Sequence, residues 1–230
     1  LIFWYGEMYN KKSVFVAFEG IEGSGKTFHS KILYKKIKKL RLPVIYTREP
    51  GGSKSAEKIR KIILSGERKK FSATTDVLLY LAARNEHFEQ TLKPALLKKK
   101  IIICDRFVDS TKAYQVYGKG VDKSLVNFIH KKTIGNFKPD ITFILKVNIS
   151  KAFKRLNKRN KINRYDKFPR KFYRKVQNAF MKIGKANRNR YVILDNSQDN
   201  KKNEAIIFNK FIKLLKRWNI HKKTWKLYIQ

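Results

Sequence analysis

The segment at residues 14–33, VFVAFEGIEGSGKTFHSKIL, restricts the possible folds of this chain more than any other stretch. Its GIEGSGKT loop, residues 20–27, fits the pattern G-x-x-x-x-G-K-[ST], with an apolar run before it and a helical pattern after it. Glycines in such a loop let backbone N–H groups turn inward around phosphate oxygens, and the positive end of the helix dipole faces the same oxygens. The segment therefore predicts a strand, a phosphate loop and a helix that together hold a nucleoside triphosphate.

Two side chains of this loop carry chemistry of their own. Lys26 can reach the β- and γ-phosphates, and the hydroxyl group of Thr27 is a suitable ligand for Mg²⁺. A motor, a molecular switch and a kinase all use such a loop, so the motif leaves these three classes open.

Apolar runs and helical periodicity alternate along the rest of the chain. Short apolar runs predict five strands, at residues 14–18, 44–46, 101–104, 141–145 and 191–194. Apolar positions at helical spacing predict helices at residues 26–40, 55–64, 75–97 with a break near Pro94, 123–134, 167–186 and 204–218. This alternation is typical of an α/β fold, here a five-stranded parallel sheet flanked by helices. We expect one domain at residues 13–218, a disordered leader at 1–12 and a tail at 219–230.

The net charge is unusually high, because 55 lysines and arginines face 17 acidic residues and give a formal charge of +38. One interpretation is a nucleic-acid-binding surface. The other is compositional drift, since AT-rich codons specify Lys, Asn, Ile, Phe and Tyr, which are all plentiful here. The basic residues are spread along the whole chain, which favours drift and leaves only nonspecific attraction to nucleic acid.

Two further observations concern a basic segment and the cellular compartment. The segment at residues 151–167 is dense in lysine and arginine, and we interpret it as a flexible basic lid, with a solvated helix end as the alternative. The chain has one cysteine, Cys104, and no apolar stretch of membrane-spanning length. Both features indicate a cytoplasmic protein without a disulfide framework.

Three more motifs place polar side chains near the phosphate loop. CDRF puts Asp105 at the carboxyl end of a strand, where its carboxylate could hold Mg²⁺, and Arg106 beside it, where it could hold a second phosphate. TREPGGS turns sharply and leaves Arg48 and Glu49 at the same edge of the sheet. LLYLAARNEHF puts Tyr80 and Arg84 on one helix face, a ring and a guanidinium group suited to a base. A motor more often has a glutamate after the strand aspartate, so the arginine favours a phosphate-bearing acceptor over hydrolysis.

With these segments in the same order and at similar spacing, the chain resembles the thymidylate kinases, the bacterial dTMP kinase family. The resemblance covers residues 13–216 and rests on the segments FEGIEGSGKT, TREPGGS, LLYLAARNEHFEQTLKPAL, CDRFVDSTKAYQ and RNKINRYD. It implies a P-loop nucleotide kinase with a basic lid, which phosphorylates dTMP to dTDP with Mg-ATP in dTTP synthesis. It also implies a homodimer.

The resemblance further implies roles for individual residues. The ATP site would consist of Gly20, Ile21, Glu22, Gly23, Ser24, Gly25, Lys26 and Thr27, with Mg²⁺ held by Thr27 and Asp105. The dTMP site would consist of Glu22 on the sugar 3′-hydroxyl, Tyr80 and Arg84 on the base, Arg48 and Arg106 on the phosphate, Thr111 and Gln115 beside thymine, and Tyr114 where a 2′-hydroxyl would clash. The catalytic cations would be Lys26, Arg106, Arg155, Arg159 and Arg164. We interpret His29, His87, His130 and His221 as surface or packing residues.

The chain departs from the family pattern at several positions. Some members carry an arginine inside the phosphate loop, where this chain has Gly23, so the resemblance implies the subtype that supplies its arginine from the lid. Phe28 replaces a second small hydroxyl residue, and Asn163 replaces the usual lid aspartate, which could loosen lid closure. The tail after Trp218 is longer than the pattern needs.

Three alternatives stay open at this stage: another nucleoside monophosphate kinase, for UMP, CMP or AMP; a nucleic-acid-stimulated ATPase; and an inactive relic with an intact loop. Tyr114 and the pair of Tyr80 and Arg84 favour a deoxypyrimidine over the first. The sequence has no second set of ATPase motifs and no base-stacking module to support the second.

Overall fold

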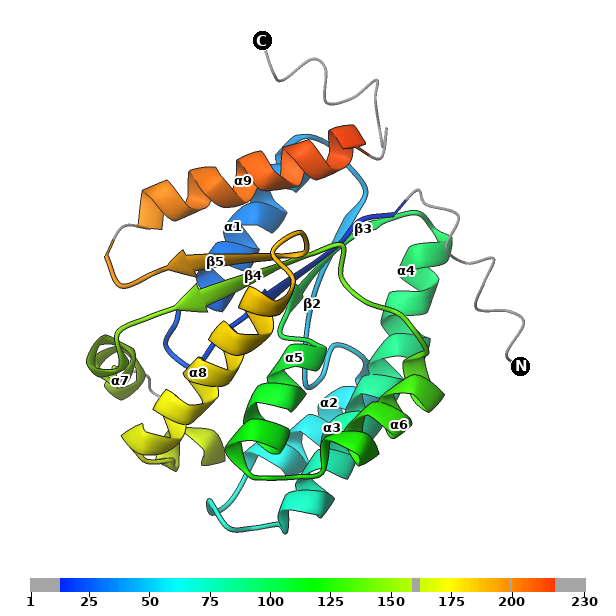
Figure 1. Cartoon of the computed structure of the whole chain (residues 1–230). Helices are drawn as coiled ribbons and strands as arrows, with labels where there is room; N and C mark the ends of the chain where they lie inside the picture. The colour runs from blue at the N-terminus through cyan, green and yellow to red at the C-terminus, as the bar shows by residue number, and fades with distance from the viewer. Residues whose placement is uncertain (1–12, 159–161, 199, 218–230) are drawn as a thin grey trace.

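The computed structural model describes residues 13–158, 162–198 and 200–217 (Figure 1). At its centre is a five-stranded sheet in the order β2-β3-β1-β4-β5, in which every neighbouring pair is parallel. The strands are β1 (Phe15–Glu19), β2 (Val44–Arg48), β3 (Ile101–Asp105), β4 (Ile141–Lys146) and β5 (Tyr191–Asp195). The predicted sheet is confirmed. Each strand ends later than predicted, at a charged residue, because apolar patterning does not detect the polar end of a buried strand.

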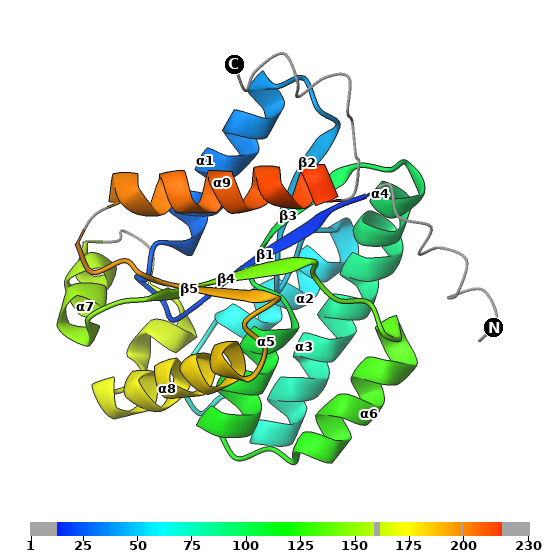
Figure 2. The same cartoon turned by 45° about the horizontal axis from the view of Figure 1, so that its top comes forward.

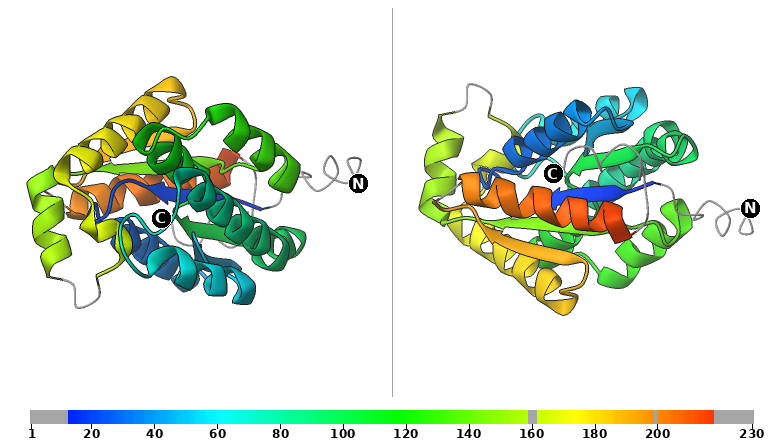
Figure 3. Two further views of the ribbon diagram at one scale, coloured as in Figure 1. Left: turned by 90° about the horizontal axis from the view of Figure 1, so that it is seen from below. Right: turned by 90° about the horizontal axis from the view of Figure 1, so that it is seen from above.

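Helices cover both faces of the sheet. Val14, Val16 and Phe18 pack against α1 (Lys26–Lys39) and α9 (Asn200–Arg217) on one face. Alternate side chains of a strand point to opposite faces, so Phe15 and Ala17 lie in a separate cluster on the other face. Figures 2 and 3 show α1 and α9 on one side of the sheet and α8 (Arg170–Ala186) on the opposite side. The continuous apolar runs of β1, β3 and β4 follow from this two-sided burial.

Three helices lie beside the sheet and position the residues that follow β2. α3 (Ala73–His87) packs between α2 (Lys54–Leu64) and α6 (Lys123–Ile134). After α3 the chain continues through a π-helical turn, η3 (Phe88–Leu92), into α4 (Lys93–Leu97). The predicted break near Pro94 is therefore misplaced: the irregular residues come before it. Pro94 lies in the first turn of α4, where its missing N–H group is tolerated.

Two helical segments have no counterpart among the predicted elements. α5 (Val108–Thr111) and the π-helical η4 (Lys112–Gly118) follow β3 directly and carry Thr111, Tyr114 and Gln115. α7 (Ile149–Asn157) follows β4 and begins at Asn148, whose side chain accepts hydrogen bonds from two backbone N–H groups of its first turn. An N-cap of this kind fixes where a helix begins.

The segment predicted as a lid, residues 151–167, is only partly exposed. Its first half belongs to α7, residues 159–161 lie outside the described part, and its end forms a 3₁₀ turn, η5 (Arg164–Lys167). Arg164 and Tyr165 are 1 % and 3 % exposed, so the end of the segment is buried, and its interpretation as a flexible lid stays a prediction. The predicted leader at 1–12 and tail at 219–230 also lie outside the described residues. Across the helices that the structure describes, none has the length and hydropathy that a membrane crossing requires.

Candidate functional site

A cavity of about 290 Å³, the central cavity, opens at the carboxyl ends of β1, β2 and β3. Parallel strands of an α/β sheet present their ligand sites at this edge. Its lining includes Lys26 from the phosphate loop, Arg48 at the end of β2 and Asp105 at the end of β3. Lys26 and Arg106 therefore face one common space, as transfer of a phosphoryl group between two bound nucleotides requires.

The cavity gathers most of the side chains that the sequence singled out, and its lining includes Glu22, Lys26, Thr27, Arg48, Tyr80, Arg84, Asp105, Arg106, Thr111, Tyr114 and Gln115. It also includes Arg60, on α2, which the sequence analysis did not select. Arg60 had a signal in retrospect, since it follows the sharp turn at residues 50–53 by two helical turns. Burial and the neighbouring positive charge of Arg48 lower the pKa of Arg60. A bound anion would therefore offset the repulsion between these two guanidinium groups.

The lysine of the phosphate loop is buried and hydrogen-bonded to the loop backbone. Lys26 is 6 % exposed, and its Nζ donates a hydrogen bond of 2.7 Å to the carbonyl oxygen of Ile21. Burial lowers the pKa of Lys26 to about 7, and the positive charge of Arg106 adds to the effect. Bound phosphate would supply the negative charge that restores the ammonium form.

Thr27 and Asp105 lie together, as a magnesium site requires. The hydroxyl group of Thr27 donates a hydrogen bond to Oδ2 of Asp105. The other carboxylate oxygen of Asp105, Oδ1, is buried and accepts no hydrogen bond from any residue that the structure describes. A hydroxyl and an orphaned carboxylate oxygen beside the phosphate loop are the ligands that Mg²⁺ prefers, so these residues fit the ion.

Arg106 is held in place by hydrogen bonds to residues of the phosphate loop. Its Nη2 donates to Oε1 of Glu22 at 2.8 Å, and its Nη1 donates to the carbonyl oxygen of Gly20 at 2.9 Å. Tyr114 donates its hydroxyl proton to the same carboxylate of Glu22 and lies with its ring beneath the guanidinium group. Although burial acts in the other direction, Arg106 and Lys26 hold the pKa of Glu22 below its usual range. Arg106 also has a φ of +72°, a backbone conformation that is rare outside glycine and fixed here by these contacts.

Arg84 lines the cavity and is almost completely buried. It is 2 % exposed, and it donates to Oε2 of Glu49 at 2.8 Å and to Oγ1 of Thr111 at 2.9 Å. Its Nη1 is buried without a hydrogen-bond partner in the described part of the chain. Because a buried unpaired donor is costly, this group is suited to a polar ligand such as a base carbonyl.

Three comparisons with known proteins bear on this site. The family model for thymidylate kinase matches residues 18–207. The thymidylate kinase of Geotalea uraniireducens is 37 % identical over 199 residues, which cover 84 % of this chain and 93 % of the relative. That of Wolbachia pipientis wMel is 42 % identical over 172 residues, 74 % of this chain and 84 % of the relative. The crystal structure of thymidylate kinase from Ehrlichia chaffeensis has 34 % identity and a TM-score of 0.70, covering 88 % of this chain and 98 % of that one.

This chain belongs to the thymidylate kinase family. The matched region includes the phosphate loop, the central cavity and all five strands apart from the first residues of β1. The resemblance inferred from the motifs is thereby confirmed, and so is the P-loop nucleotide kinase fold.

A polar network that the sequence analysis did not predict holds Arg84 in place. Glu49, 5 % exposed, accepts from Arg84 and from Nδ1 of His87 at 3.1 Å, and Nε2 of His87 lies 2.7 Å from Oγ1 of Thr47. His87 is fully buried, so it is not a surface residue; its role is to hold Glu49. The neighbouring Pro-Gly-Gly turn was the available signal, because it brings Glu49 under α3.

A second network holds the aromatic wall of the cavity. The hydroxyl group of Tyr165 donates to Oδ2 of Asp76 at 2.6 Å and accepts from Nε2 of Gln115 at 3.1 Å. Tyr80 meets the ring of Tyr165 edge-on, with ring centroids 6.1 Å apart. These contacts place two aromatic rings and one amide in the lining of the cavity, which is suited to a nucleoside.

The lid arginines of the family pattern lie outside the lining of the central cavity in the described residues. Arg164 pairs with the buried carboxylate of Asp76, and its Nε and Nη1 have no partner within the described ranges. Arg155 donates to the carbonyl oxygen of Gly23 at 3.0 Å. Arg159 lies outside the described residues. Their catalytic role stays a prediction, and to meet a phosphoryl group Arg164 would have to leave Asp76.

Arg48 is half exposed and joined to Glu57 by a 3.1 Å ion pair. Glu57 also accepts a hydrogen bond of 3.0 Å from the backbone N–H group of Gly52. The guanidinium group is therefore held at the cavity mouth by the turn and by α2. An exposed ion pair of this kind contributes little to the free energy of unfolding. Its effect is to hold the guanidinium group of Arg48 in one position.

Glu19, at the end of β1, is a buried carboxylic acid that no motif identified. Its Oε1 accepts from the backbone N–H groups of Phe107 and Ser110, at 2.8 and 3.1 Å, and its Oε2 accepts from the Ser110 hydroxyl at 2.6 Å. These bonds fix the start of α5 and with it the backbone of Arg106. Burial, followed by the negative charge of Asp109, raises the pKa of Glu19 to about 8.

Glu19 should make the stability of the protein depend on pH. Its folded-state pKa lies above the ordinary value of 4.5, so the folded protein binds more protons than the unfolded chain between about pH 4.5 and 8. Its stabilising contribution is complete at the acid end and is lost as the pH rises through this window. Glu19→Gln has no proton to lose, so the melting temperature should fall less between pH 5 and 8 than it does in the wild type.

Calorimetric melting of both proteins at the two pH values measures this difference. Glu67→Gln is the matched control, because Glu67 is fully exposed. Equal pH profiles for Glu19→Gln and the wild type would contradict a raised pKa at this position.

Proposed function

We propose that this chain transfers the γ-phosphoryl group of Mg-ATP to the phosphate of dTMP and forms dTDP, reversibly, as a step of dTTP synthesis. One observation carries the proposal: the phosphate-loop lysine, the anchored Arg106 and Arg84, which has an unpaired donor in the described residues, line a single cavity. Family membership at 37–42 % identity to thymidylate kinases supports it.

ATP would lie on the phosphate loop, residues 20–27, with its γ-phosphate toward Lys26. Mg²⁺ would be held by Thr27 and Asp105, and when bound it neutralises phosphate charge that would otherwise repel the acceptor. The wrapped backbone of the loop and the first turn of α1 supply further donors to the phosphates.

The acceptor dTMP would lie across the cavity. Arg84 would hydrogen-bond the base beside the ring of Tyr80, and Arg106 with Arg48 would hold the phosphate. Glu22 would accept from the 3′-hydroxyl, while Tyr114, which is locked to Glu22, would clash with a 2′-hydroxyl. Thr111 and Gln115 complete the side that faces thymine, and this arrangement favours a deoxypyrimidine.

Catalysis would rest on position and charge. The acceptor phosphate has a second pKa of about 6 and is mainly a dianion at pH 7, so no general base is needed. Lys26 and a lid arginine would neutralise the transferring group while Arg106 aligns the attacking oxygen. Because the loop has Gly23 where other members carry arginine, that lid cation would come from Arg155, Arg159 or Arg164. Closure of the lid would also keep water from the γ-phosphate.

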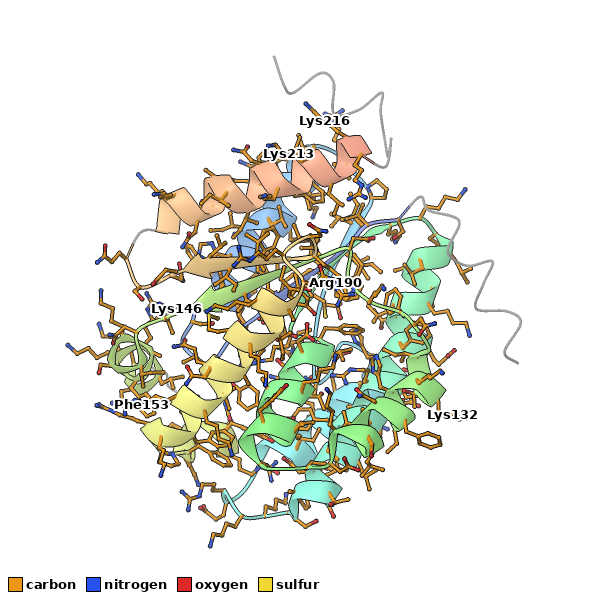
Figure 4. All side chains as sticks on the ribbon, viewed as in Figure 1. Lys132, Lys146, Phe153, Arg190, Lys213 and Lys216 are labelled. Atoms are coloured by element: carbon orange, nitrogen blue, oxygen red, sulfur yellow. The ribbon has the colours of Figure 1, made fainter. Side chains whose placement is uncertain are left out.

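The +38 charge does not favour a nucleic-acid-dependent activity. Figure 4 shows basic side chains on separate elements, with Lys132 on α6, Lys146 at the end of β4, and Lys213 and Lys216 on α9. Charge spread in this way gives nonspecific attraction without a defined binding track.

We place the reaction in the cytoplasm, where its substrates would be available.

We also propose that the chain forms a homodimer through α2, α3 and α6. These helices pack together and carry the exposed apolar side chains Ile62, Leu78 and Phe128, which are 47, 45 and 62 % exposed.

Light scattering should give a mass of twice 27.2 kDa, and Phe128→Asp should shift it toward the monomer. Added salt should favour the dimer, since it screens repulsion between like-charged subunits. A monomer at every salt concentration would contradict this interface.

Lys26→Ala should abolish phosphoryl transfer from ATP to dTMP and leave the fold intact. The lysine donates only to loop atoms, so its loss removes charge from the γ-phosphate site without opening the core. A coupled assay for dTDP and ADP, with a no-acceptor control, measures the loss. Lys35→Ala, exposed on the same helix, is the matched control and should be fully active. Near-normal turnover in Lys26→Ala would refute the assignment.

Arg84→Ala should raise the KM for dTMP by about 10- to 100-fold, the range expected for loss of a charged hydrogen bond. The KM for ATP should change far less, because Arg84 is on the base side of the cavity. Steady-state kinetics with each substrate varied in turn gives both constants. Arg174→Ala, on the exposed face of α8, controls for loss of one positive charge. Equal changes in both constants would place the base pocket elsewhere.

A further inference from the structure

A second polar cluster lies behind the phosphate loop, outside the central cavity. It consists of His29 on α1, Asn196 after β5 and Asn203 on α9, which are 1, 1 and 5 % exposed. Nδ2 of Asn196 donates to the carbonyl oxygen of Ser24 at 2.8 Å. The cluster therefore joins the phosphate loop to the edge of the sheet.

The orientation of each amide in this cluster is fixed by a carbonyl group. A carbonyl oxygen only accepts, so the atom of Asn196 that meets Ser24 must be its NH₂ group. Asn203 likewise donates to the carbonyl oxygen of Asp195 at 2.9 Å and to Oδ1 of Asn196 at 3.1 Å. Oδ1 of Asn196 is thus left as an acceptor for both of its remaining neighbours.

This orientation determines the tautomer of His29. Its Nε2 lies 2.9 Å from Oδ1 of Asn196, so Nε2 must carry a proton and donate. Nδ1 of the same ring is buried with no hydrogen-bond partner among the described residues. His29 therefore donates a hydrogen bond that holds Asn196 in place. The sequence analysis expected only a surface or packing role for this residue.

Asn196 also occupies the space behind Gly25. Gly25 has a φ of +93°, and a Cβ atom there would overlap Nδ2 of Asn196. The loop backbone thus rests directly on the amide group. Gly25 is the residue before Lys26 and the N-cap of α1, so its position sets both the lysine and the first N–H groups of the helix.

Arg155 completes the support from α7. Its two terminal nitrogens donate to the carbonyl oxygens of Gly23, at 3.0 Å, and Asn196, at 3.2 Å. The segment from Gly23 to Gly25 is consequently held from α7 by Arg155 and from the end of β5 by Asn196. No atom of this support faces the nucleoside end of the cavity.

We propose that Asn196, oriented by His29, is a positioning residue for the ATP phosphates, which it controls through the backbone of Ser24 and Gly25. The role rests on the proposed function, since it names what aligns the donor in that reaction. Asn196 touches no substrate; it holds the loop that does. Its effect is therefore specific to ATP and leaves dTMP binding unchanged.

Asn196→Ala tests the proposal. The KM for ATP should rise about five- to tenfold, the range for loss of one or two positioning hydrogen bonds, and the KM for dTMP should stay within about twofold. Asn187→Ala is the matched control, because its side chain accepts one backbone hydrogen bond at the other end of β5. An unchanged KM for ATP, or equal increases for both substrates, would overturn the proposal.

Two variants of His29 test the coupling even if Asn196→Ala does not fold. His29→Gln keeps a side-chain donor and should retain a near wild-type KM for ATP, while His29→Leu should raise it. Equal effects of Gln and Leu would overturn the orienting role of His29.

Binding of the nonhydrolysable analogue AMP-PNP with Mg²⁺, measured calorimetrically without acceptor, separates this inference from the proposed function. A wild-type protein that fails to phosphorylate dTMP would contradict the proposed function. Weaker AMP-PNP binding by Asn196→Ala would still support the positioning role in that case. A wild type that makes dTDP, together with unchanged AMP-PNP binding by the variant, would sink the positioning role alone.

Discussion

The phosphate loop keeps its shape because neighbouring elements approach its backbone more closely than any side chain would allow. A Cβ atom at Gly20 would lie 2.5 Å from the carbonyl oxygen of Leu145 on β4, and one at Gly23 would lie 2.6 Å from that of Ala152 on α7. At Gly25 the neighbour is the amide group of Asn196. The loop is thus supported by β4, α7 and the end of β5, and the positions of Lys26 and Thr27 depend on all three.

Three arginines that line the central cavity are each paired with a carboxylate. Glu22 holds Arg106, Glu49 holds Arg84 and Glu57 holds Arg48, while Asp76 holds Arg164 outside the cavity lining. In a chain with only 17 acidic residues, this concentration around one cavity is informative. Pairing keeps guanidinium groups in place before any nucleotide arrives, so they need little rearrangement when phosphate binds. The excess charge elsewhere is spread over several elements, and in the described residues it includes exposed ion pairs such as Lys146 with Asp195 and Lys167 with Glu67.

Sequence reasoning found the groups that would touch substrate better than those that hold them. Lys26, Arg84 and Arg106 stood out because they belong to motifs with a chemical meaning. Glu19 and His87 did not, because a buried acid or histidine shows its role only through partners distant in sequence: Glu19 bonds residues 107–110, and His87 bonds Thr47 and Glu49. The pairing of Arg164 with Asp76 could not be predicted for the same reason, since these two residues lie far apart in the sequence, and the role of the segment as a lid stays a prediction.

The sequence by itself determined the five strands, the longer helices, the parallel sheet, the phosphate loop and the family, because these follow from local periodicity and short contiguous motifs. Tertiary structure alone decided which polar side chains meet. Asn196 lies 172 residues from Ser24 along the chain, and Arg106 lies 84 from Glu22, yet each pair forms a hydrogen bond. Such contacts depend on how the crossover helices bring the strand ends together, and a single sequence carries no local signal for that geometry.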